Sequence, residues 1–179
     1  WDQLMTRFGT FLTQERATLC QRLEPLLRKT YQDLSGEKQD LEMNYQSSGR
    51  QDTTEYWEVL QQRQGEELRT RSCLIGPHRD EIQFHLGPGL VRRFGSQGQR
   101  RTLALALRLA QADILRDLGH ENPVILLDDC FSELDPLRQG RLLEWLESCS
   151  QVMITTATPL QLNRPYCHYQ VEEGRVQPC

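Results

Sequence analysis

The chain has 179 residues, of which 37% are hydrophobic and 26% charged, and its formal net charge is −4 at pH 7. No apolar run approaches the roughly 18 consecutive residues of a membrane span, no signal peptide opens the chain, and the acidic balance argues against a protein that coats nucleic acid by bulk charge. The six cysteines show no C-x-x-C spacing, so neither a zinc site nor a disulfide framework is expected, and free thiols without an export signal indicate the cytosol.

The first 34 residues predict one long helix. Apolar residues recur there at spacings of three and four, which gives a single apolar face, and Pro25 lies inside the pattern, so a kink or break is expected at that point. Because this helix is already under way at Trp1, we expect the chain to be a fragment of a longer polypeptide. The residues of the apolar face are Leu4, Phe8, Phe11, Leu12, Leu19, Leu23, Leu26, Leu27, Tyr31 and Leu34.

A short strand and a second helix follow. Apolar residues alternate at 41–45 as they do in a strand. Asp52 and Glu55 have the spacing of a capping box, so a helix is predicted from there to about Arg71, antiparallel to the first. Residues 1–75 are therefore expected to form a helical arm with a small strand insert.

From residue 76 the pattern changes to short strands and helices. Alternation at 82–86, a GPG turn and the returning LVRRF predict a β-hairpin. The succession of strand, helix and strand further on predicts a right-handed crossover in an α/β sheet, so residues 76–179 are expected to form an α/β lobe. The elements predicted beyond the hairpin are a helix from Ser96 to about Leu118, a strand at 124–128, a helix from Pro136 to about Cys149, a strand at 151–157 and a last hairpin that turns at Glu173-Gly174.

The stretch VILLDD at 124–129 runs four aliphatic residues into two acids, which is the Walker B pattern. The carboxyl end of such a strand would hold Asp128 where it can bind Mg²⁺ beside nucleotide phosphates. Asp129 would reach the attacking water as a general base. Taken alone the motif leaves an alternative open, because a buried strand that runs into an acidic turn is common.

A second stretch, FGSQGQRR at 94–101, places a hydroxyl and a glycine at a helix start. Ser96, Gln97, Gly98 and Gln99 would present N–H groups and a hydroxyl at the positive end of the helix dipole, which is a phosphate-binding arrangement. The alternative is an ordinary N-cap by Ser96, which stabilises a helix by about 1 kcal/mol.

Together these motifs, followed by SELD and VMITT, resemble the RecF family of SMC-type and ABC-type ATPases in order and spacing. The resemblance is tight over 76–159 and rests on architecture over 1–75. It implies the C-terminal lobe of an ABC-type ATPase head, with ATP and Mg²⁺ as cofactors, carried on an arm that is a shortened coiled coil. It also implies that Ser96 to Gln99 form the signature motif, which contacts the γ-phosphate held by the opposite protomer of a dimer.

The resemblance assigns the remaining site residues as well. Asp128 becomes the metal ligand and Asp129 the catalytic acid, while Ser132 to Asp135 form the D-loop at the dimer interface. Thr155 and Thr156 stand where many ABC enzymes carry a switch histidine. An aspartate in place of the usual catalytic glutamate is one methylene shorter, which favours slow, switch-like hydrolysis.

The glycine-rich phosphate loop that such a head needs does not occur in the 179 residues. In the RecF family this loop lies on the N-terminal side of the arm. We therefore expect this stretch alone to bind ATP poorly and to be inactive as an ATPase.

Two basic stretches remain. In GPHRDE, His78 and Arg79 could contact phosphate or nucleic acid, but a salt bridge with Asp80 or Glu81 is the favoured interpretation. The most basic stretch of the chain flanks the signature motif; it is either a solvated face or a contact with the DNA backbone, which the resemblance makes credible. Its residues are Arg92, Arg93, Arg100 and Arg101.

The function that the resemblance implies is ATP-driven dimerisation on DNA, at a duplex or at a junction of single-stranded and double-stranded DNA. With RecO and RecR such a protein helps to load RecA at gaps, and hydrolysis releases it. One alternative is a non-catalytic DNA-binding or adaptor module. Another is a different SMC-like head, such as a RecN or exonuclease relative, but an arm of about 75 residues is too short for a long coiled coil.

Overall fold

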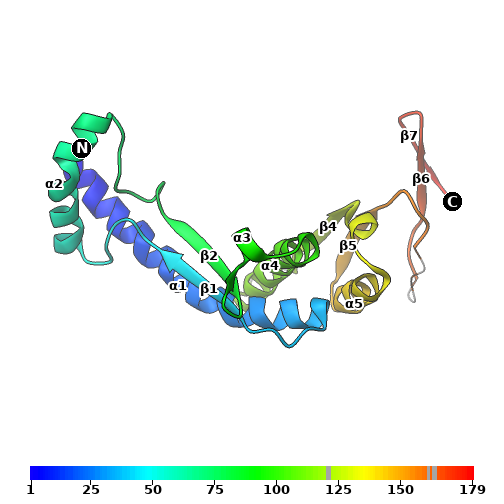
Figure 1. The fold of residues 1–179 in the computed structure, drawn as a ribbon. Coiled ribbons are helices and arrows are strands. Elements are labelled where there is room, and N and C mark those ends of the chain that lie inside the picture. The colour runs from blue at the N-terminus through cyan, green and yellow to red at the C-terminus, as the bar shows by residue number, and fades with distance from the viewer. Residues whose placement is uncertain (120–121, 161, 163–164) are drawn as a thin grey trace. The chain divides into compact units, whose positions relative to one another are not determined.

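The computed structural model describes residues 1–119, 122–160, 162 and 165–179, and Figure 1 shows the fold. The predicted mixture of helices and strands is confirmed, and none of the helices in the described part of the chain is both long and apolar enough to cross a membrane. In chain order the elements are α1 (Asp2–Ser35), β1 (Leu41–Gln46), α2 (Thr53–Thr70), β2 (Glu81–Leu86), β3 (Gly89–Leu90), α3 (Val91–Phe94), α4 (Gln97–Asp117), β4 (Val124–Asp128), η1 (Cys130–Glu133), α5 (Pro136–Glu147), β5 (Gln151–Thr155), β6 (Tyr169–Glu172) and β7 (Arg175–Pro178).

The chain divides into two compact units, 1–121 and 122–179, and each is described by itself. Within the first unit, β1 pairs antiparallel with β2 from Leu41↔Leu86 to Gln46↔Glu81. This pairing crosses the boundary expected near residue 75, which stays a prediction, and residues 1–75 and helix α4 consequently belong to one compact unit.

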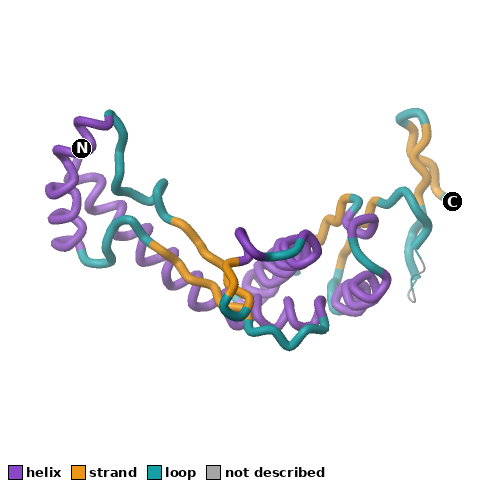
Figure 2. The backbone as a smooth tube through the Cα atoms, in the orientation of Figure 1, coloured by secondary structure: helices purple, strands orange, loops and turns teal. Residues whose placement is uncertain are grey.

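Helix α1 is the long element of this unit, and Figure 2 shows β1 and β2 running along it. It passes through Pro25 without ending, so the predicted break does not occur. In its C-terminal half the predicted apolar face is buried, through Leu23, Leu27 and Leu34 among others, and α4 and β1 pack on this part. Each fully buried leucine contributes roughly 1.5–3 kcal/mol to stability.

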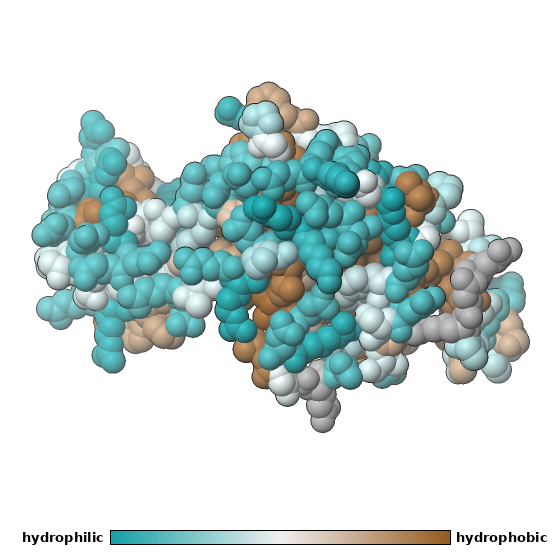
Figure 3. All heavy atoms as spheres, turned by 90° about the horizontal axis from the view of Figure 1, so that it is seen from below, coloured by the Kyte–Doolittle hydropathy of each residue, from teal (hydrophilic) through white to brown (hydrophobic). Residues whose placement is uncertain are grey.

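The N-terminal half of α1 buries a different face from the predicted one. The ring of Tyr56 on α2 lies so close that a Cβ on Gly9 would stand 2.4 Å from the tyrosine Oη, and only small residues permit that approach. The buried residues of this half are Thr6, Gly9, Thr10 and Thr13. The predicted apolar residues Leu4, Phe8, Phe11, Leu12 and Leu19 are exposed instead. On the face that Figure 3 shows, hydrophobic residues likewise reach the surface in separate groups among hydrophilic ones.

Helix α2 begins where the sequence predicted. The carboxylate of Asp52 accepts hydrogen bonds from the N–H groups of Thr54 (2.8 Å) and Glu55 (3.1 Å), which satisfies two of the free donors of the first turn. The predicted hairpin is only partly right. β3 has two residues, and the rest of LVRRF forms the short helix α3 rather than a returning strand.

A buried carboxylate connects several elements of the first unit. Asp80, whose side chain is 3% exposed, accepts hydrogen bonds from the Tyr45 hydroxyl (2.5 Å), the Ser48 N–H (3.0 Å) and Arg16 (3.1 Å). Burial alone would raise the pKa of Asp80, but the hydrogen bonds from Tyr45, Ser48 and Arg16 leave that pKa below its ordinary value. The residue thus links α1, β1, the loop after β1 and the loop before β2.

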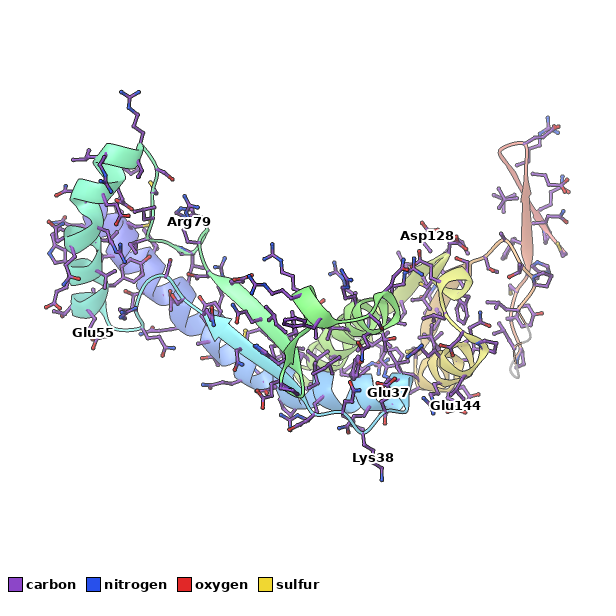
Figure 4. All side chains as sticks on the ribbon, in the orientation of Figure 1. Glu37, Lys38, Glu55, Arg79, Asp128 and Glu144 are labelled. Carbon is purple, nitrogen blue, oxygen red and sulfur yellow. The ribbon has the colours of Figure 1, made fainter. Side chains whose placement is uncertain are left out.

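A salt bridge of His78 or Arg79 with Asp80 or Glu81 was the favoured interpretation of GPHRDE, and the structure shows other partners for these residues. Asp80 pairs with Arg16 rather than with its neighbour Arg79. Arg79, labelled in Figure 4, donates to the Cys73 carbonyl (2.8 Å) and to the Ser72 hydroxyl (2.6 Å), which closes the loop before β2.

The second unit contains a parallel pair of strands. β4 and β5 are in register from Val124↔Gln151 to Asp128↔Thr155, and α5 connects them. Ile125 and Leu127 are buried, whereas on the other face of β4 Leu126 is 69% exposed. The predicted parallel strand is thus confirmed, but only one of its faces is covered within this unit. β6 and β7 form the predicted last hairpin, turning at Glu173-Gly174.

We expect Asp80→Asn to lower the free energy of unfolding by about 2–3 kcal/mol at pH 7, because the amide loses the charge that three donors share. Since the folded pKa of Asp80 is lowered, its contribution is present above the unfolded pKa and is lost as the pH falls below about 4. Urea unfolding of this chain at several pH values measures both effects.

The matched control is Asp117→Asn, at an exposed position, which should change the free energy of unfolding by less than about 0.5 kcal/mol. If Asp80→Asn and wild type had the same urea midpoint, the role given to Asp80 would be contradicted. The same would follow if the difference in their free energies of unfolding grew at low pH.

Candidate functional site

The predicted site residues lie in both units, and the first group surrounds the start of α4. Ser96 is the N-cap: its hydroxyl accepts a hydrogen bond from the Gln99 N–H (3.1 Å), and the Gln99 side chain accepts from the Ser96 N–H (2.9 Å). The alternative interpretation of Ser96 as a helix cap is therefore confirmed. Within the described part of the chain the N–H groups of Gln97 and Gly98 make no hydrogen bond, and both are first-turn donors directed along the helix axis.

The four arginines predicted to contact DNA lie on two elements. Arg92 and Arg93 are on α3, and both are exposed. Arg92 forms an ion pair with Glu81 (2.8 Å). Arg100, in the first turn of α4, donates from Nε to the Gly95 carbonyl (3.1 Å), and its neighbour Arg101 is half-buried. Contact with DNA remains a prediction for this stretch.

The second group lies at the carboxyl end of β4, where Figure 4 labels Asp128. The parallel register places Asp128 opposite Thr155. The Thr155 hydroxyl donates a hydrogen bond to Asp128 Oδ1 (2.5 Å). The hydroxyl oxygen of Thr155 also accepts a hydrogen bond from the Asp129 N–H (3.1 Å). One hydroxyl therefore fixes the side chain of the first acid and the backbone of the second. This positioning role of Thr155 was missed by the sequence analysis, which placed the residue only where many ABC enzymes carry a switch histidine.

Asp129 has a backbone conformation that is uncommon for a residue other than glycine. Its φ of 46° and ψ of 26° lie in the left-handed region, which aspartate tolerates better than most residues. The carbonyls and hydroxyls around it secure the turn: Asp129 N–H also donates to the Thr155 carbonyl (3.1 Å), and the Ser132 hydroxyl donates to the Asp129 carbonyl (2.9 Å). A sharp turn directly after β4 thus takes Asp129 out of the regular alternation of the strand, of which Asp128 is the last residue.

The predicted D-loop ends in a helix cap. Asp135 accepts from the Arg138 N–H (3.0 Å) and from its guanidinium (2.5 Å), and the backbone hydrogen bond from Arg138 is the main reason why the pKa of Asp135 is lowered. Gln139 of α5 donates to the carbonyls of Phe131 (2.7 Å) and Leu134 (3.1 Å), and these two hydrogen bonds hold the loop against the start of the helix. No local sequence pattern would have indicated this role of Gln139.

The last predicted residue, Thr156, turns back on its own loop. Its hydroxyl donates to the Thr158 carbonyl (2.9 Å) and accepts from the Thr158 N–H (3.2 Å).

Burial raises the pKa of the thiol of Cys130, next to Asp129 in the chain, and the carboxylates of Asp128 and Asp129 raise it further. Cys130 is therefore a neutral thiol near neutral pH and a poor metal ligand.

Among the described residues no group of three or more histidine, cysteine, aspartate and glutamate side chains could hold a metal ion. Mg²⁺, however, is held in many nucleotide sites by one or two carboxylates, water and substrate phosphates. Asp128 and the Thr155 hydroxyl fit that kind of site, in which phosphates supply most of the other ligands.

No family model matches the chain. It is 34% identical over 190 aligned positions to the DNA replication and repair protein RecF of Rippkaea orientalis, with 100% of this chain and 50% of the relative covered. It is 37% identical to RecF of Heliobacterium modesticaldum, with 98% and 50% covered. The chain thus spans about half the length of these relatives.

Solved structures give the same result. A structure of the recombination mediator protein RecF with ATP matches with a TM-score of 0.82 and 27% identity, covering 99% of this chain and 49% of that one. A structure of RecF with an ATP analogue matches with a TM-score of 0.81 and 28% identity. The matched part is the C-terminal half of that structure.

The left-handed turn at Asp129 gives a test of the site geometry. Asp129→Gly should leave this chain more stable than Asp129→Ala by about 1 kcal/mol, because only glycine enters that region without a steric cost. Urea unfolding of both variants measures the difference.

At Glu144, inside α5, the same two substitutions should rank the other way, with alanine better by about 1 kcal/mol. If alanine were as good as glycine at position 129, the backbone there would not have the conformation described.

Proposed function

This chain belongs to the RecF family of DNA replication and repair proteins, and from that premise we propose that it forms the arm and C-terminal lobe of an ATPase head acting in recombinational repair. The observation that carries the proposal is the pair of acids at the carboxyl end of β4, held by Thr155, in a chain that aligns over its length with a RecF–ATP structure. Residues 1–75 would be the arm and 76–179 the lobe with the signature, Walker B and D-loop motifs.

The two acids would have separate roles. Mg²⁺, when bound, neutralises charge on the β- and γ-phosphates of ATP. Asp128 would hold that ion from β4, with its carboxylate oriented by the Thr155 hydroxyl (2.5 Å). Asp129 would accept a proton from the attacking water, and its short side chain favours slow turnover.

The signature motif would act on the nucleotide of a second protomer. The free N–H groups of Gln97 and Gly98, at the positive end of α4, suit the negative γ-phosphate. Ser96 would bring its hydroxyl to the same phosphate by giving up part of its cap, and Ser132 and Asp135 would lie close to the opposite site. ATP would thus close a homodimer on DNA, and RecO and RecR would be its partners in loading RecA at gaps.

A non-catalytic adaptor is the second candidate. One observation favours it: Ser96, Asp135 and Thr156 each make local hydrogen bonds that account for them as structural residues. The substitutions Asp129→Asn and Asp128→Asn separate the candidates, because an adaptor needs no catalytic acid.

In the full-length protein Ser96→Arg should abolish ATP-dependent dimerisation, because a long charged side chain would occupy the place of the other protomer's phosphate. Sedimentation velocity with and without ATP measures the dimer. Ser96→Thr, which keeps the hydroxyl and the cap, is the control and should dimerise. A Ser96→Arg protein that dimerised as well as wild type would refute the signature assignment.

Asp129→Asn should slow ATP hydrolysis by about 10²–10⁴-fold, because the amide keeps the size but cannot take a proton. The ATP-bound dimer should then stay on DNA longer than the wild-type dimer. Asp128→Asn should instead weaken nucleotide binding and dimerisation together, since the metal ligand loses its charge.

The measurements are ATP turnover and the lifetime of the DNA-bound dimer in the full-length protein. Loss of the dimer in Asp129→Asn, with Asp128→Asn merely slowed, would reverse the two roles. If neither substitution changed turnover or lifetime, the adaptor would be the better account.

A further inference from the structure

We propose that Gln139 of α5 is a positioning residue, which holds the turn at Asp129 and thereby sets the rate of ATP hydrolysis. The proposal rests on the role of general base proposed above for Asp129. Gln139 lies outside the signature, Walker B and D-loop motifs, and its side-chain hydrogen bonds go to backbone carbonyls rather than to either acid. It acts through the backbone of the loop between β4 and α5.

The turn at Asp129 needs support from its surroundings. Its φ of 46° and ψ of 26° lie in the left-handed region, which residues other than glycine adopt mainly where neighbouring contacts hold them. A relaxed backbone would carry the Asp129 carboxylate to a different place, because a side chain follows its own φ and ψ. The position of this acid therefore depends on the contacts at both ends of the turn.

Two hydrogen-bond partners next to the turn restrain it. The Asp129 N–H donates to the carbonyl and to the hydroxyl of Thr155 on β5, each at 3.1 Å. The Ser132 hydroxyl donates to the Asp129 carbonyl (2.9 Å). Ser132 belongs to the same loop, so its hydroxyl can hold the turn only if the loop itself is fixed.

Gln139 fixes this loop. It lies near the start of α5, and because helical side chains point back towards the N-terminus of their helix, its amide reaches the preceding residues. The amide nitrogen donates to the carbonyls of Phe131 (2.7 Å) and Leu134 (3.1 Å), one on each side of Ser132 in the chain. The Phe131 ring is buried, so the loop is held both by its ring and by α5.

Few side chains could make these two hydrogen bonds. Both require donors on one uncharged nitrogen at the length of glutamine, whereas glutamate offers only acceptors when ionised and asparagine is one methylene shorter. Gln139 is half-buried. Without its donors the two carbonyls would turn towards water, and the hydrogen bond between Ser132 and Asp129 would be free to break.

The test uses Gln139→Met in the full-length protein, because methionine matches the length of glutamine but has no donor. The kcat for ATP should fall by about 10–100-fold, since a small displacement of a catalytic group has an effect of that order. The ATP concentration for half-maximal dimerisation should change by less than about twofold, because the metal ligand and the signature motif are intact.

Two further variants belong to this test. Gln139→Ala fits the helix and removes the same donors, so it should give the same result. Glu144→Met is the matched control, at an exposed position of the same helix that Figure 4 labels, and should hydrolyse ATP like the wild type.

Amide hydrogen exchange tests the loop without nucleotide. Residues 130–134 should exchange about tenfold faster in Gln139→Met than in the wild type, while β5 should exchange at the wild-type rate. Equal exchange of residues 130–134 in the two proteins would overturn the proposal.

A double mutant shows whether Gln139 acts through Asp129. When Asp129→Asn is already present, Gln139→Met should slow turnover by less than about twofold, because the base that it positions is gone. A further loss of about tenfold would mean that Gln139 acts elsewhere and would overturn the proposal. A wild type without ATP turnover would refute the proposed function itself, whereas wild-type turnover that Gln139→Met left unchanged would refute only the role of Gln139.

Discussion

One hydroxyl group, that of Thr155, determines how the two acids of the site are presented. It donates to the Asp128 carboxylate and accepts from the Asp129 N–H. The hydroxyl must therefore be held in one orientation, in which it donates to one acid and accepts from the other. The parallel register of β4 and β5 provides that direction, because it places Thr155 directly opposite Asp128. A shift of one residue in that register would separate the hydroxyl from both acids. The chemistry proposed for Asp128 and Asp129 therefore depends on the register of β4 and β5, the two strands that α5 connects.

The first unit uses a buried charge in a comparable way. Asp80 collects donors from α1, β1 and the loop after β1, and the strand that follows it, β2, leads through β3 and α3 into α4. Because β2 also pairs with β1, residues 1–75 and the start of α4 share one framework. The N–H groups of Gln97 and Gly98 are thus presented by a helix that packs on α1 and follows α3.

Local patterns in the sequence predicted what local forces determine. The caps at Asp52 and Ser96 and the strand before Asp128 follow from short-range spacing, and the structure confirms them. The apolar stripe from Leu4 to Leu19 misled the prediction, since the contact that decides which face is buried is between Gly9 and Tyr56, far apart in the chain. Long-range pairs such as Arg16 with Asp80 have no signature in a single sequence, and this also holds for the link between Thr155 and Asp128.

We propose that this lobe contributes a metal ligand to one nucleotide and a signature motif to another. The most direct measurement is a structure of the full-length protein with Mn²⁺ and a non-hydrolysable ATP analogue, in which anomalous scattering locates the metal. We expect a metal peak bound to Asp128 directly or through one water, and a γ-phosphate within hydrogen-bond distance of the N–H groups of Gln97 and Gly98 of the second protomer. A metal and nucleotide remote from the end of β4, with α4 facing solvent, would contradict it.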